Sequence, residues 1–325
     1  MGRASRFATS FGAFTMSLAI ALISLGAAPA PPPIQDWSNI EVVVVRPDHP
    51  GPALWHIVKD KSEIWILPTV SPVPKGLPWD TQEVASLLKG ANALILPPRA
   101  TMGVFEGLWF LMTGLDVLEQ PSGTALEDTL PAPLRARFVA TRTRIGRDAD
   151  RYSEFLGGVA ALRLEGDYWS FANFTPNGPQ RTIESLASRA GVTARPSATY
   201  PAMNVIKDVP KMTPAAHLAC LTMALDDIDT QSLHAVAAAG AWAKGDIAGV
   251  KAHYSETRLD DCLNQNAAYA VLRETANRDM TSAIIAALAK PGTSVAVMPM
   301  GFFLRKGGVL ERLEGAGLTV TGPGS

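Results

Sequence analysis

The chain of 325 residues is 47% hydrophobic, and its 29 basic and 30 acidic side chains nearly cancel. It holds no block of like charges, which excludes the basic surfaces typical of proteins that bind nucleic acids or anionic membranes, so we expect no nucleic-acid partner. Once an N-terminal segment of about 30 residues is set aside, the remaining chain is long enough for one large or two modest domains with a well-buried core.

The N-terminus has the layout of a secretory signal peptide. Two arginines precede an apolar run over residues 11–25, and small residues follow up to Ala30. The run is shorter than the ~20 residues of a membrane-spanning helix, and no later stretch is apolar enough. We predict a signal peptide over residues 1–30, a linker over residues 31–52, and a periplasmic or secreted mature chain without a transmembrane segment. An uncleaved N-terminal anchor is the alternative, because prolines surround the expected cleavage point.

A folded domain is predicted over residues 53–325, and it opens with a βαβ unit. A buried strand is expected at Ile64–Leu67 and the next at Leu94–Leu96, with a proline-rich loop and a helix between them. Asp80, followed by Glu83 three residues later, gives this helix a capping-box start. The crossover between the two strands is expected to be right-handed.

The middle of the chain is predicted to be mostly helical, because apolar residues recur there at steps of three and four. A short strand is expected at 192–194, and the chain closes with a strand at 295–298, a helix at 309–315 and a strand at 318–321. Strand–helix pairs at both ends of the chain around a helical middle predict an α/β domain with a mixed central sheet. The predicted central helices cover residues 134–145, 152–162, 183–190, 214–225, 231–244, 247–254 and 266–288.

The chain has two cysteines, Cys220 and Cys262. An even number of cysteines in an exported chain favours a disulfide, because the compartment is oxidising. Two buried free thiols are one alternative. A metal site is another, because His217 lies three residues before Cys220 and the two would share a helix face.

No self-standing catalytic signature occurs in the sequence. It lacks a nucleophile elbow, a phosphate-cradling glycine loop and a two-histidine helical metal motif. The histidines are scattered, and we expect each to be a surface or strand residue rather than a metal ligand. They are His49, His56, His217, His234 and His253.

The segment PALWHIVKDKSEIWILPTVSPVPKGLPW, from Pro52 to Trp79, resembles the opening of the TraB/GumN family of bacterial envelope proteins. In that family the strand ends in Gly-Thr-x-His, and the histidine is a metal ligand or a catalytic residue. The aligned tetrapeptide here ends in Ser71, and a neutral hydroxyl is a poor ligand for a transition metal. The family's next strand ends in a glutamate, and Pro97 stands in its place.

The resemblance continues to the C-terminus and carries further replacements. Gln180 and Ala198 stand where the family has acidic residues, whereas Arg278 matches a family arginine in the long helix. A second family histidine precedes a Gly-Val helix start, and either Phe302 or Phe303 occupies its position here. Two histidines and three acids of the family pattern are therefore replaced.

The resemblance implies the α/β fold of this family, which is of the EreA/ChaN-like type, and a cleft at the carboxyl ends of the sheet strands. Family members that act as metalloenzymes, including the Tiki metalloproteases, need the histidines and acids that this chain lacks. We therefore predict no metal, no cofactor and no catalytic residue of the family kind. The predicted cleft would instead bind an unknown protein or a small apolar ligand. Its positions are Ser71, Pro97, Gln180, Ala198, Arg278, Phe302 and Phe303.

Two alternatives to this hypothesis remain open. One is a hydrolase with altered, metal-independent chemistry in the same cleft, with Ser71 as the nucleophile or Arg278 as an anion clamp. His56 and Lys75 are the candidates for a general base near Ser71. The other alternative is haem binding through a tyrosine or histidine, for which the resemblance identifies no ligand. The alignment register is open between residues 103 and 170, where the resemblance is weakest.

Overall fold

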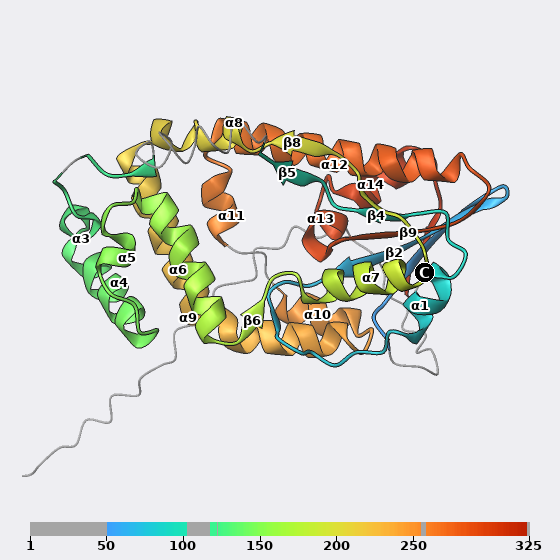
Figure 1. Cartoon of the computed structure of the whole chain (residues 1–325), viewed down its shortest axis with the longest axis horizontal. Helices are drawn as coiled ribbons and strands as arrows, with labels where there is room; N and C mark the ends of the chain where they lie inside the picture. The colour runs from blue at the N-terminus through green and yellow to red at the C-terminus, as the bar shows by residue number, and fades with distance from the viewer. Residues whose placement is uncertain (1–50, 103–117, 122, 255–257, 324–325) are drawn as a thin grey trace, which may run out of the picture. The chain divides into compact units, whose positions relative to one another are not determined.

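The computed structural model describes residues 51–102, 118–121, 123–254 and 258–323. The predicted signal peptide and nearly all of the predicted linker lie outside these residues. The described chain is built on a six-stranded sheet in the order β10-β1-β2-β9-β4-β7. Figure 1 labels β2, β9 and β4, three neighbouring strands of this sheet. Its strands are β1 (Trp55–Lys59), β2 (Ser62–Thr69), β4 (Leu94–Leu96), β7 (Ala194–Pro196), β9 (Gly292–Pro299) and β10 (Val320–Thr321).

The sheet is mixed, as the sequence predicts. The four neighbours β2, β9, β4 and β7 run parallel, whereas β1 pairs antiparallel with both β2 and β10. Thr69 lies opposite Pro299, and Leu96 lies opposite Pro196. The carboxyl ends of the four parallel strands therefore meet along one edge of the sheet, which we call the carboxyl edge.

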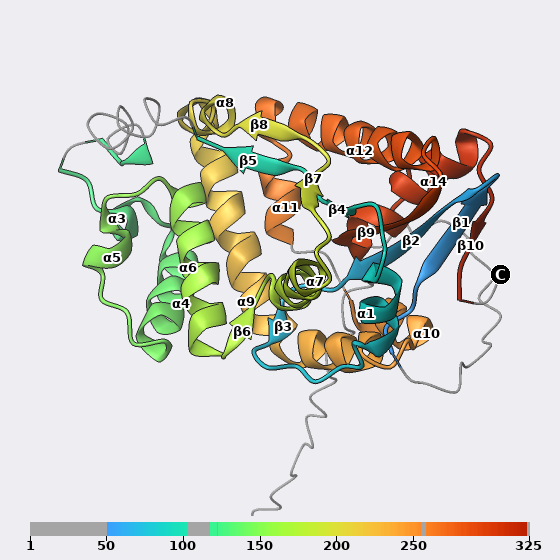
Figure 2. The ribbon, with the colours of Figure 1, turned by 45° about the vertical axis from the view of Figure 1, so that its right-hand side comes forward.

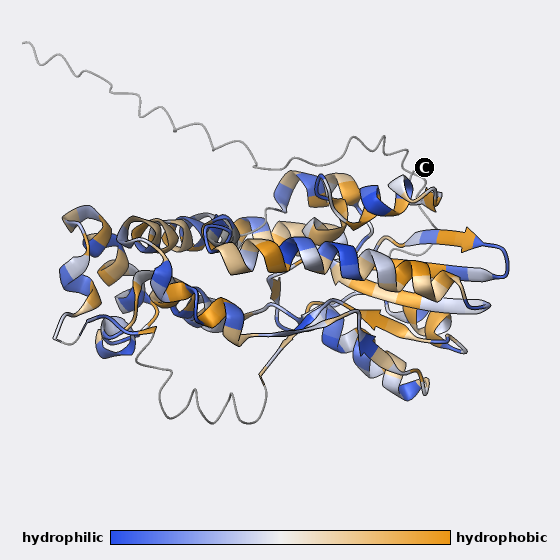
Figure 3. Ribbon diagram, turned by 90° about the horizontal axis from the view of Figure 1, so that it is seen from above, coloured by the Kyte–Doolittle hydropathy of each residue, from blue (hydrophilic) through white to orange (hydrophobic). Residues whose placement is uncertain are grey.

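Helices cover both faces of the sheet. The chain passes from β2 to β4 through α1 (Gln82–Leu88) and from β4 to β7 through α7 (Gly178–Arg189), both times in the same direction across the sheet. It returns in the opposite direction, from β7 to β9, through α12 (Ala267–Leu288). Right-handed crossovers therefore place α1 and α7 on one face and α12 on the other, where α14 (Val309–Gly315) packs on it. Figure 2 shows α1 and α7 together, and Figure 3 shows helices along both sides of the apolar strands.

A second, helical region has a hydrophobic core of its own. Phe138, Tyr152 and Leu164 are fully buried there against Leu221 of α9. The main core, by contrast, contains the inner strands of the sheet and the last turns of α9. One helix thus contributes to both cores. The helical region consists of α3 (Leu126–Thr129), α4 (Ala132–Arg144), α5 (Asp150–Ser153), α6 (Gly157–Phe171), α11 (Arg258–Leu263) and the first half of α9 (Pro214–Trp242).

The remaining elements are short. Two-stranded sheets pair β3 (Val73–Pro74) with β6 (Phe174–Thr175) and β5 (Arg99–Thr101) with β8 (Thr199–Pro201). Three short helices and a 3-10 turn complete the described chain. They are α8 (Met203–Ile206), η3 (Val209–Lys211), α10 (Ile247–His253) and α13 (Met300–Leu304).

The prediction of two helices at 214–225 and 231–244 is wrong, because α9 is one continuous helix of 29 residues. The acidic side chains at the expected break are neutralised from neighbouring elements. Arg137 donates to Asp226 at 2.8 Å and to Asp229 at 3.0 Å, and Arg258 donates to Asp226 at 3.4 Å. These ion pairs let the helix continue through a polar stretch.

The prediction of one helix over 152–162 is also wrong, because the chain leaves helical conformation between α5 and α6. Gly157 begins α6 at a close contact with α9, where an added Cβ would stand 2.9 Å from the carbonyl oxygen of His217. A residue with a side chain would hold the two helices apart. The break in the helix brings this glycine to the crossing point.

The first helix begins slightly later than the capping-box pattern predicts. Thr81 occupies the N-cap and makes no side-chain capping bond, whereas Oδ1 of Asp80 accepts a hydrogen bond from the backbone N–H of Gln82 at 2.8 Å. Asp80 therefore stabilises the turn before the helix. Within the part of the chain that the structure describes, no helix is both long and apolar enough to cross a membrane.

Candidate functional site

Four of the predicted cleft positions follow directly on the four parallel strands. Ser71 comes two residues after the end of β2, and Pro97 follows β4. Ala198 comes two residues after β7, and Phe302 lies in α13, which begins where β9 ends. Loops at the carboxyl edge of a parallel sheet are where α/β proteins place their ligand sites.

Ser71 lines a small hollow of about 10 Å³ at the end of β2. His234 of α9 and His253 of α10 also line it, and their ring centroids are 6.0 Å apart. The rings of Pro72 and Tyr254 also line the hollow, and Pro72 follows Ser71 through a cis peptide bond. A serine hydroxyl and two exposed imidazoles therefore share one hollow.

The proximity of His234 and His253 to Ser71 was not predicted from the sequence. The two histidines are on different helices, and only the packing of α10 on α9 brings them together. No spacing rule in the sequence could have paired them. The predicted base candidates lie elsewhere: Nε2 of His56 is 2.8 Å from the Glu63 carboxylate, and Lys75 lines a different hollow.

His56 is held on β1 by two neighbours. Its ring stacks on Trp65 with centroids 3.8 Å apart, while its Nε2 hydrogen-bonds the carboxylate of Glu63. The pKa of that carboxyl is lowered chiefly by a hydrogen bond from the hydroxyl of Thr293 and further by His56. His56 is thus part of a surface network of the sheet, and it is not among the residues around Ser71.

Pro97 and Ala198 lie next to each other, at the point where the parallel pair β4–β7 ends and the parallel pair β5–β8 begins. The backbone N–H of Ser197 donates to the carbonyl of Leu96, and the N–H of Arg99 donates to the carbonyl of Ala198, both at 2.9 Å. The main chains of the β4–β5 and β7–β8 segments therefore run side by side past these positions. The hydroxyl of Ser197 is buried here without a hydrogen-bond partner among the described residues.

Gln180 and Arg278 occupy helices on opposite faces of the sheet. Gln180, in the first turn of α7, donates to Glu184 at 2.8 Å. Arg278 of α12 has a side chain that is 63% exposed and lies 3.6 Å from Asp279. Neither residue lines the hollow of Ser71. Gln180 and Arg278, the two predicted cleft positions that lie on these long helices, are therefore not among the residues around Ser71.

A tyrosine joins the strand after Ala198 to the helix of Arg278. The hydroxyl of Tyr200 donates to Oδ2 of Asp279 at 2.7 Å. Burial, followed by this hydrogen bond, raises the pKa of Tyr200 well above its usual range, although the positive charge of Arg278 opposes the shift. Tyr200 therefore stays protonated and fixes β8 on α12.

The two phenylalanines of the last motif have different environments. Phe303 is fully buried, and its ring meets that of Trp55 edge to face at a centroid distance of 5.2 Å. Phe302 is only partly buried against the same core. Phe303 is therefore a core residue, and Phe302 is the one of the pair that retains exposed surface near the carboxyl edge.

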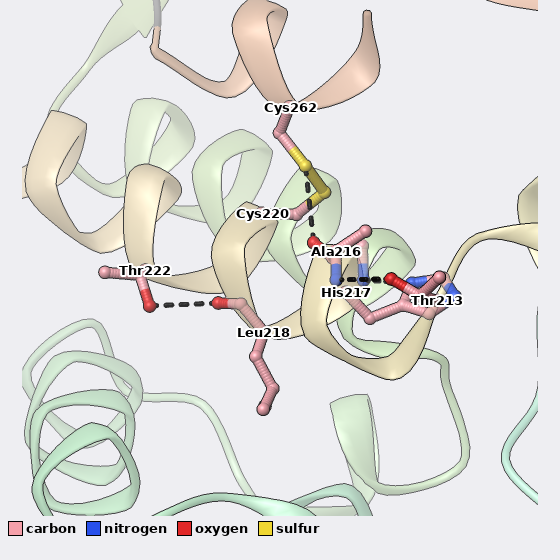
Figure 4. The surroundings of a disulfide bond; sticks show 8 residues. Thr213, Ala216, His217, Leu218, Cys220, Thr222 and Cys262 are labelled. Atoms are coloured by element: carbon pink, nitrogen blue, oxygen red, sulfur yellow. Dashed lines mark hydrogen bonds between the residues drawn. A yellow bond between two sulfur atoms is a disulfide. The ribbon is translucent and has the colours of Figure 1, made fainter. Parts of the chain in front are cut away.

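The predicted disulfide is confirmed, and it makes the metal hypothesis for His217 and Cys220 wrong. Cys220 of α9 is bonded to Cys262 of α11 with a Cα–Cα distance of 5.1 Å, so neither sulfur is a thiolate (Figure 4). Nδ1 of His217 accepts a hydrogen bond from the N–H of Gly158 at 3.2 Å, and burial lowers its pKa. His217 is thus a neutral, structural side chain.

No group of three or more His, Cys, Asp or Glu side chains that could hold a metal ion occurs in residues 51–102, 118–121, 123–254 and 258–323. The profile of the TraB/PrgY/gumN family matches residues 53–322. The chain belongs to this family. The match covers the whole sheet and the helical region of this family member, so the resemblance seen in its sequence motifs is confirmed. No curated protein and no solved structure matches it significantly.

Proposed function

We propose that this TraB/PrgY/gumN family member is an exported protein that has lost metal-dependent hydrolase activity and binds a ligand or partner without catalysis. One observation carries the proposal. The residues at the family positions after the four parallel strands are Ser71, Pro97, Ala198 and Phe302, and none of these four offers a carboxylate or an imidazole. A divalent cation needs such donors, and without the ion there is no Lewis acid and no activated water.

The remaining chemistry of the carboxyl edge favours an apolar ligand or an apolar part of a partner. Pro97, Ala198 and Phe302 are each partly buried and partly exposed, so they offer non-polar surface next to the packed core. Burial of such surface stabilises a complex by roughly 25 cal/mol for each Å² removed from water. A site of this kind selects by shape and apolarity, which suits binding better than hydrolysis.

Export is part of the proposal. The arginines and the apolar run of the first 30 residues have the layout of a signal peptide, and the Cys220–Cys262 disulfide fits an oxidising compartment. We therefore place the protein's function in the bacterial periplasm or outside the cell. A fusion of the first 35 residues to a reporter that is active only after export tests this part, and a cytoplasmic fusion product would contradict it.

A metal-binding experiment tests the loss of the family chemistry. After dialysis against buffer, the purified protein is expected to retain less than about 0.1 equivalents of zinc, manganese or cobalt, because the aligned positions supply at most a hydroxyl and an amide oxygen. A variant with Ser71→His, Pro97→Glu and Phe302→His restores donors of the family type and is the matched control. One tightly held equivalent in the natural protein, lost on changing Ser71 or Gln180, would overturn the proposal.

A dye-binding experiment tests the apolar surface. Anilinonaphthalene sulfonate is expected to bind the natural protein with enhanced fluorescence, and Phe302→Asp should weaken that binding about ten-fold. Phe171→Asp is the control, because Phe171 is 56% exposed on α6, away from the carboxyl edge. Equal binding by the natural protein and both variants would show that the dye, and with it an apolar ligand, does not use this edge.

The hollow around Ser71 favours a second candidate function, a metal-independent serine hydrolase. In this mechanism His234 or His253 accepts the proton of the Ser71 hydroxyl while the Ser71 oxygen attacks a substrate carbonyl. Water later hydrolyses the acyl group from Ser71. A burst of p-nitrophenol from p-nitrophenyl acetate that Ser71→Ala abolishes would support it. The control His56→Gln should leave such a burst unchanged, and the absence of any burst would exclude the candidate.

A further inference from the structure

One hollow of the described chain is lined by none of the predicted cleft residues. It has a volume of about 470 Å³ and lies between α7 and the segment that follows β3. Figure 2 shows β3, β6 and α7 close together in this part of the fold. We call this hollow the basic groove. Its lining residues are Lys75, Gly76, Thr175, Gly178, Arg181, Thr182, Ser185 and Arg189.

The charges of the basic groove all have one sign. Lys75, Arg181 and Arg189 line it, and none of its lining residues is acidic. Throughout the described residues, none of these three side chains has a carboxylate within ion-pair distance. The arginines of the helical region, by contrast, are mostly paired, as Arg137 is with Asp226. Three unpaired cations around one hollow attract an anion.

Hydrogen bonds position the two guanidinium groups and the backbone that carries Lys75. The backbone N–H of Lys75 donates to the carbonyl of Asn173 at 2.8 Å, which ties its segment to the strand pair β3–β6. Nη2 of Arg181 donates to the buried hydroxyl of Thr175 at 2.6 Å, and Nη1 of Arg189 donates to Ser185 at 2.8 Å. Each guanidinium uses one donor for positioning and keeps others for a ligand.

The spacing of the cations sets the length of that ligand. Arg181 and Arg189 are eight residues apart on α7, which separates their Cα atoms by about 12 Å along the helix axis. An extended anion with charge near both ends matches this spacing better than a single small anion does. Arginine forks and a lysine ammonium are the usual partners of phosphate oxygens, and the hydroxyls of Thr182 and Ser185 add polar atoms between them.

We propose that the basic groove binds an extended, phosphate-bearing small anion through Lys75, Arg181 and Arg189. Gln180 lies outside the face of α7 that lines the groove and is bonded to Glu184, so this site is separate from the predicted cleft. The inference stands on its own contacts and does not depend on the function proposed for the carboxyl edge. The volume of the groove lies in the range of small-molecule sites in proteins.

Isothermal titration with sodium tripolyphosphate in about 50 mM salt tests the inference, and ATP and orthophosphate are titrated in parallel. Tripolyphosphate or ATP is expected to bind at least about ten-fold more tightly than orthophosphate, because an extended anion matches the spacing of the cations better. Arg181→Gln and Arg189→Gln should each weaken that binding about ten-fold or more.

The control is Lys61→Gln, which removes one charge at the exposed turn between β1 and β2 and should leave the affinity nearly unchanged. All variants change exposed side chains, and circular dichroism checks that they fold. No binding of either triphosphate by the natural protein would overturn the inference. So would equal weakening by Lys61→Gln and Arg181→Gln, since that result would mean attraction by net charge only. Preference for ATP over tripolyphosphate would identify an organic phosphate as the ligand.

Discussion

Removal of the disulfide between Cys220 and Cys262 should destabilise the helical region strongly. The bridge joins residues 42 positions apart, and the loop-closure entropy for a loop of that size corresponds to about 4 kcal/mol at 25 °C. This is a large share of the ~5 to 15 kcal/mol that stabilises a typical domain. Both cysteines are fully buried in the core of the helical region, so each Cys→Ala change also leaves a small cavity.

Urea unfolding of the oxidised protein and of the double variant Cys220→Ala, Cys262→Ala measures the effect by far-ultraviolet circular dichroism. With a slope of about 3 kcal/mol per molar urea, a loss of 4 kcal/mol lowers the midpoint by about 1.3 M. The reduced natural protein is the control, because it loses the bridge but keeps both sulfur atoms. A difference below about 1 kcal/mol between oxidised and reduced protein would refute the entropic argument.

Two further predictions concern buried hydrogen bonds. The pKa of the Asp167 carboxyl is raised by burial but lowered more by hydrogen bonds from Arg151 and Tyr152, so it lies below its usual value. Asp167→Asn should therefore lower the free energy of unfolding by about 2 kcal/mol at pH 7 in urea unfolding. The difference should shrink as the pH falls below about 4, where the carboxylate becomes protonated first in the unfolded chain and then, below its lowered pKa, in the folded protein. An equal cost at pH 7 and pH 3 would contradict this. Nε1 of Trp242 donates to the carbonyl of Pro68 at 2.7 Å inside the main core. Trp242→Phe should therefore lower the free energy of unfolding by about 1 to 3 kcal/mol in the same urea experiment. An unchanged free energy of unfolding would show that this bond contributes no net stability.

The buried central strands and most helices could be predicted from the sequence, because the pattern of their apolar residues reflects which face is buried. The strand expected at Ile64–Leu67 is the centre of β2, and the long C-terminal helix begins at Ala267, one residue after its N-cap Asn266. β1 was not predicted. It is only five residues long, and its hairpin turns through Asp60 at a φ of 55° instead of through a glycine, so the usual turn signal is missing.

The errors arise where tertiary contacts override local signals. The continuous helix α9 depends on Arg137 and Arg258, which come from α4 and α11 and neutralise the acids in its middle. No window of sequence around Asp226 contains that information. The convergence of His234 and His253 on Ser71 has the same origin, because it follows from the packing of two helices and not from spacing.

The fold itself explains how the family positions could change without loss of structure. Ser71, Pro97 and Ala198 all lie after strands and not within them, so their side chains are not part of the pairing that holds the sheet together. Phe303, by contrast, packs on Trp55 in the core, where a polar side chain would be costly. Under the proposed function, replacement of residues in such loops leaves the strand order and both cores intact, while the carboxyl edge binds an apolar ligand in place of an ion.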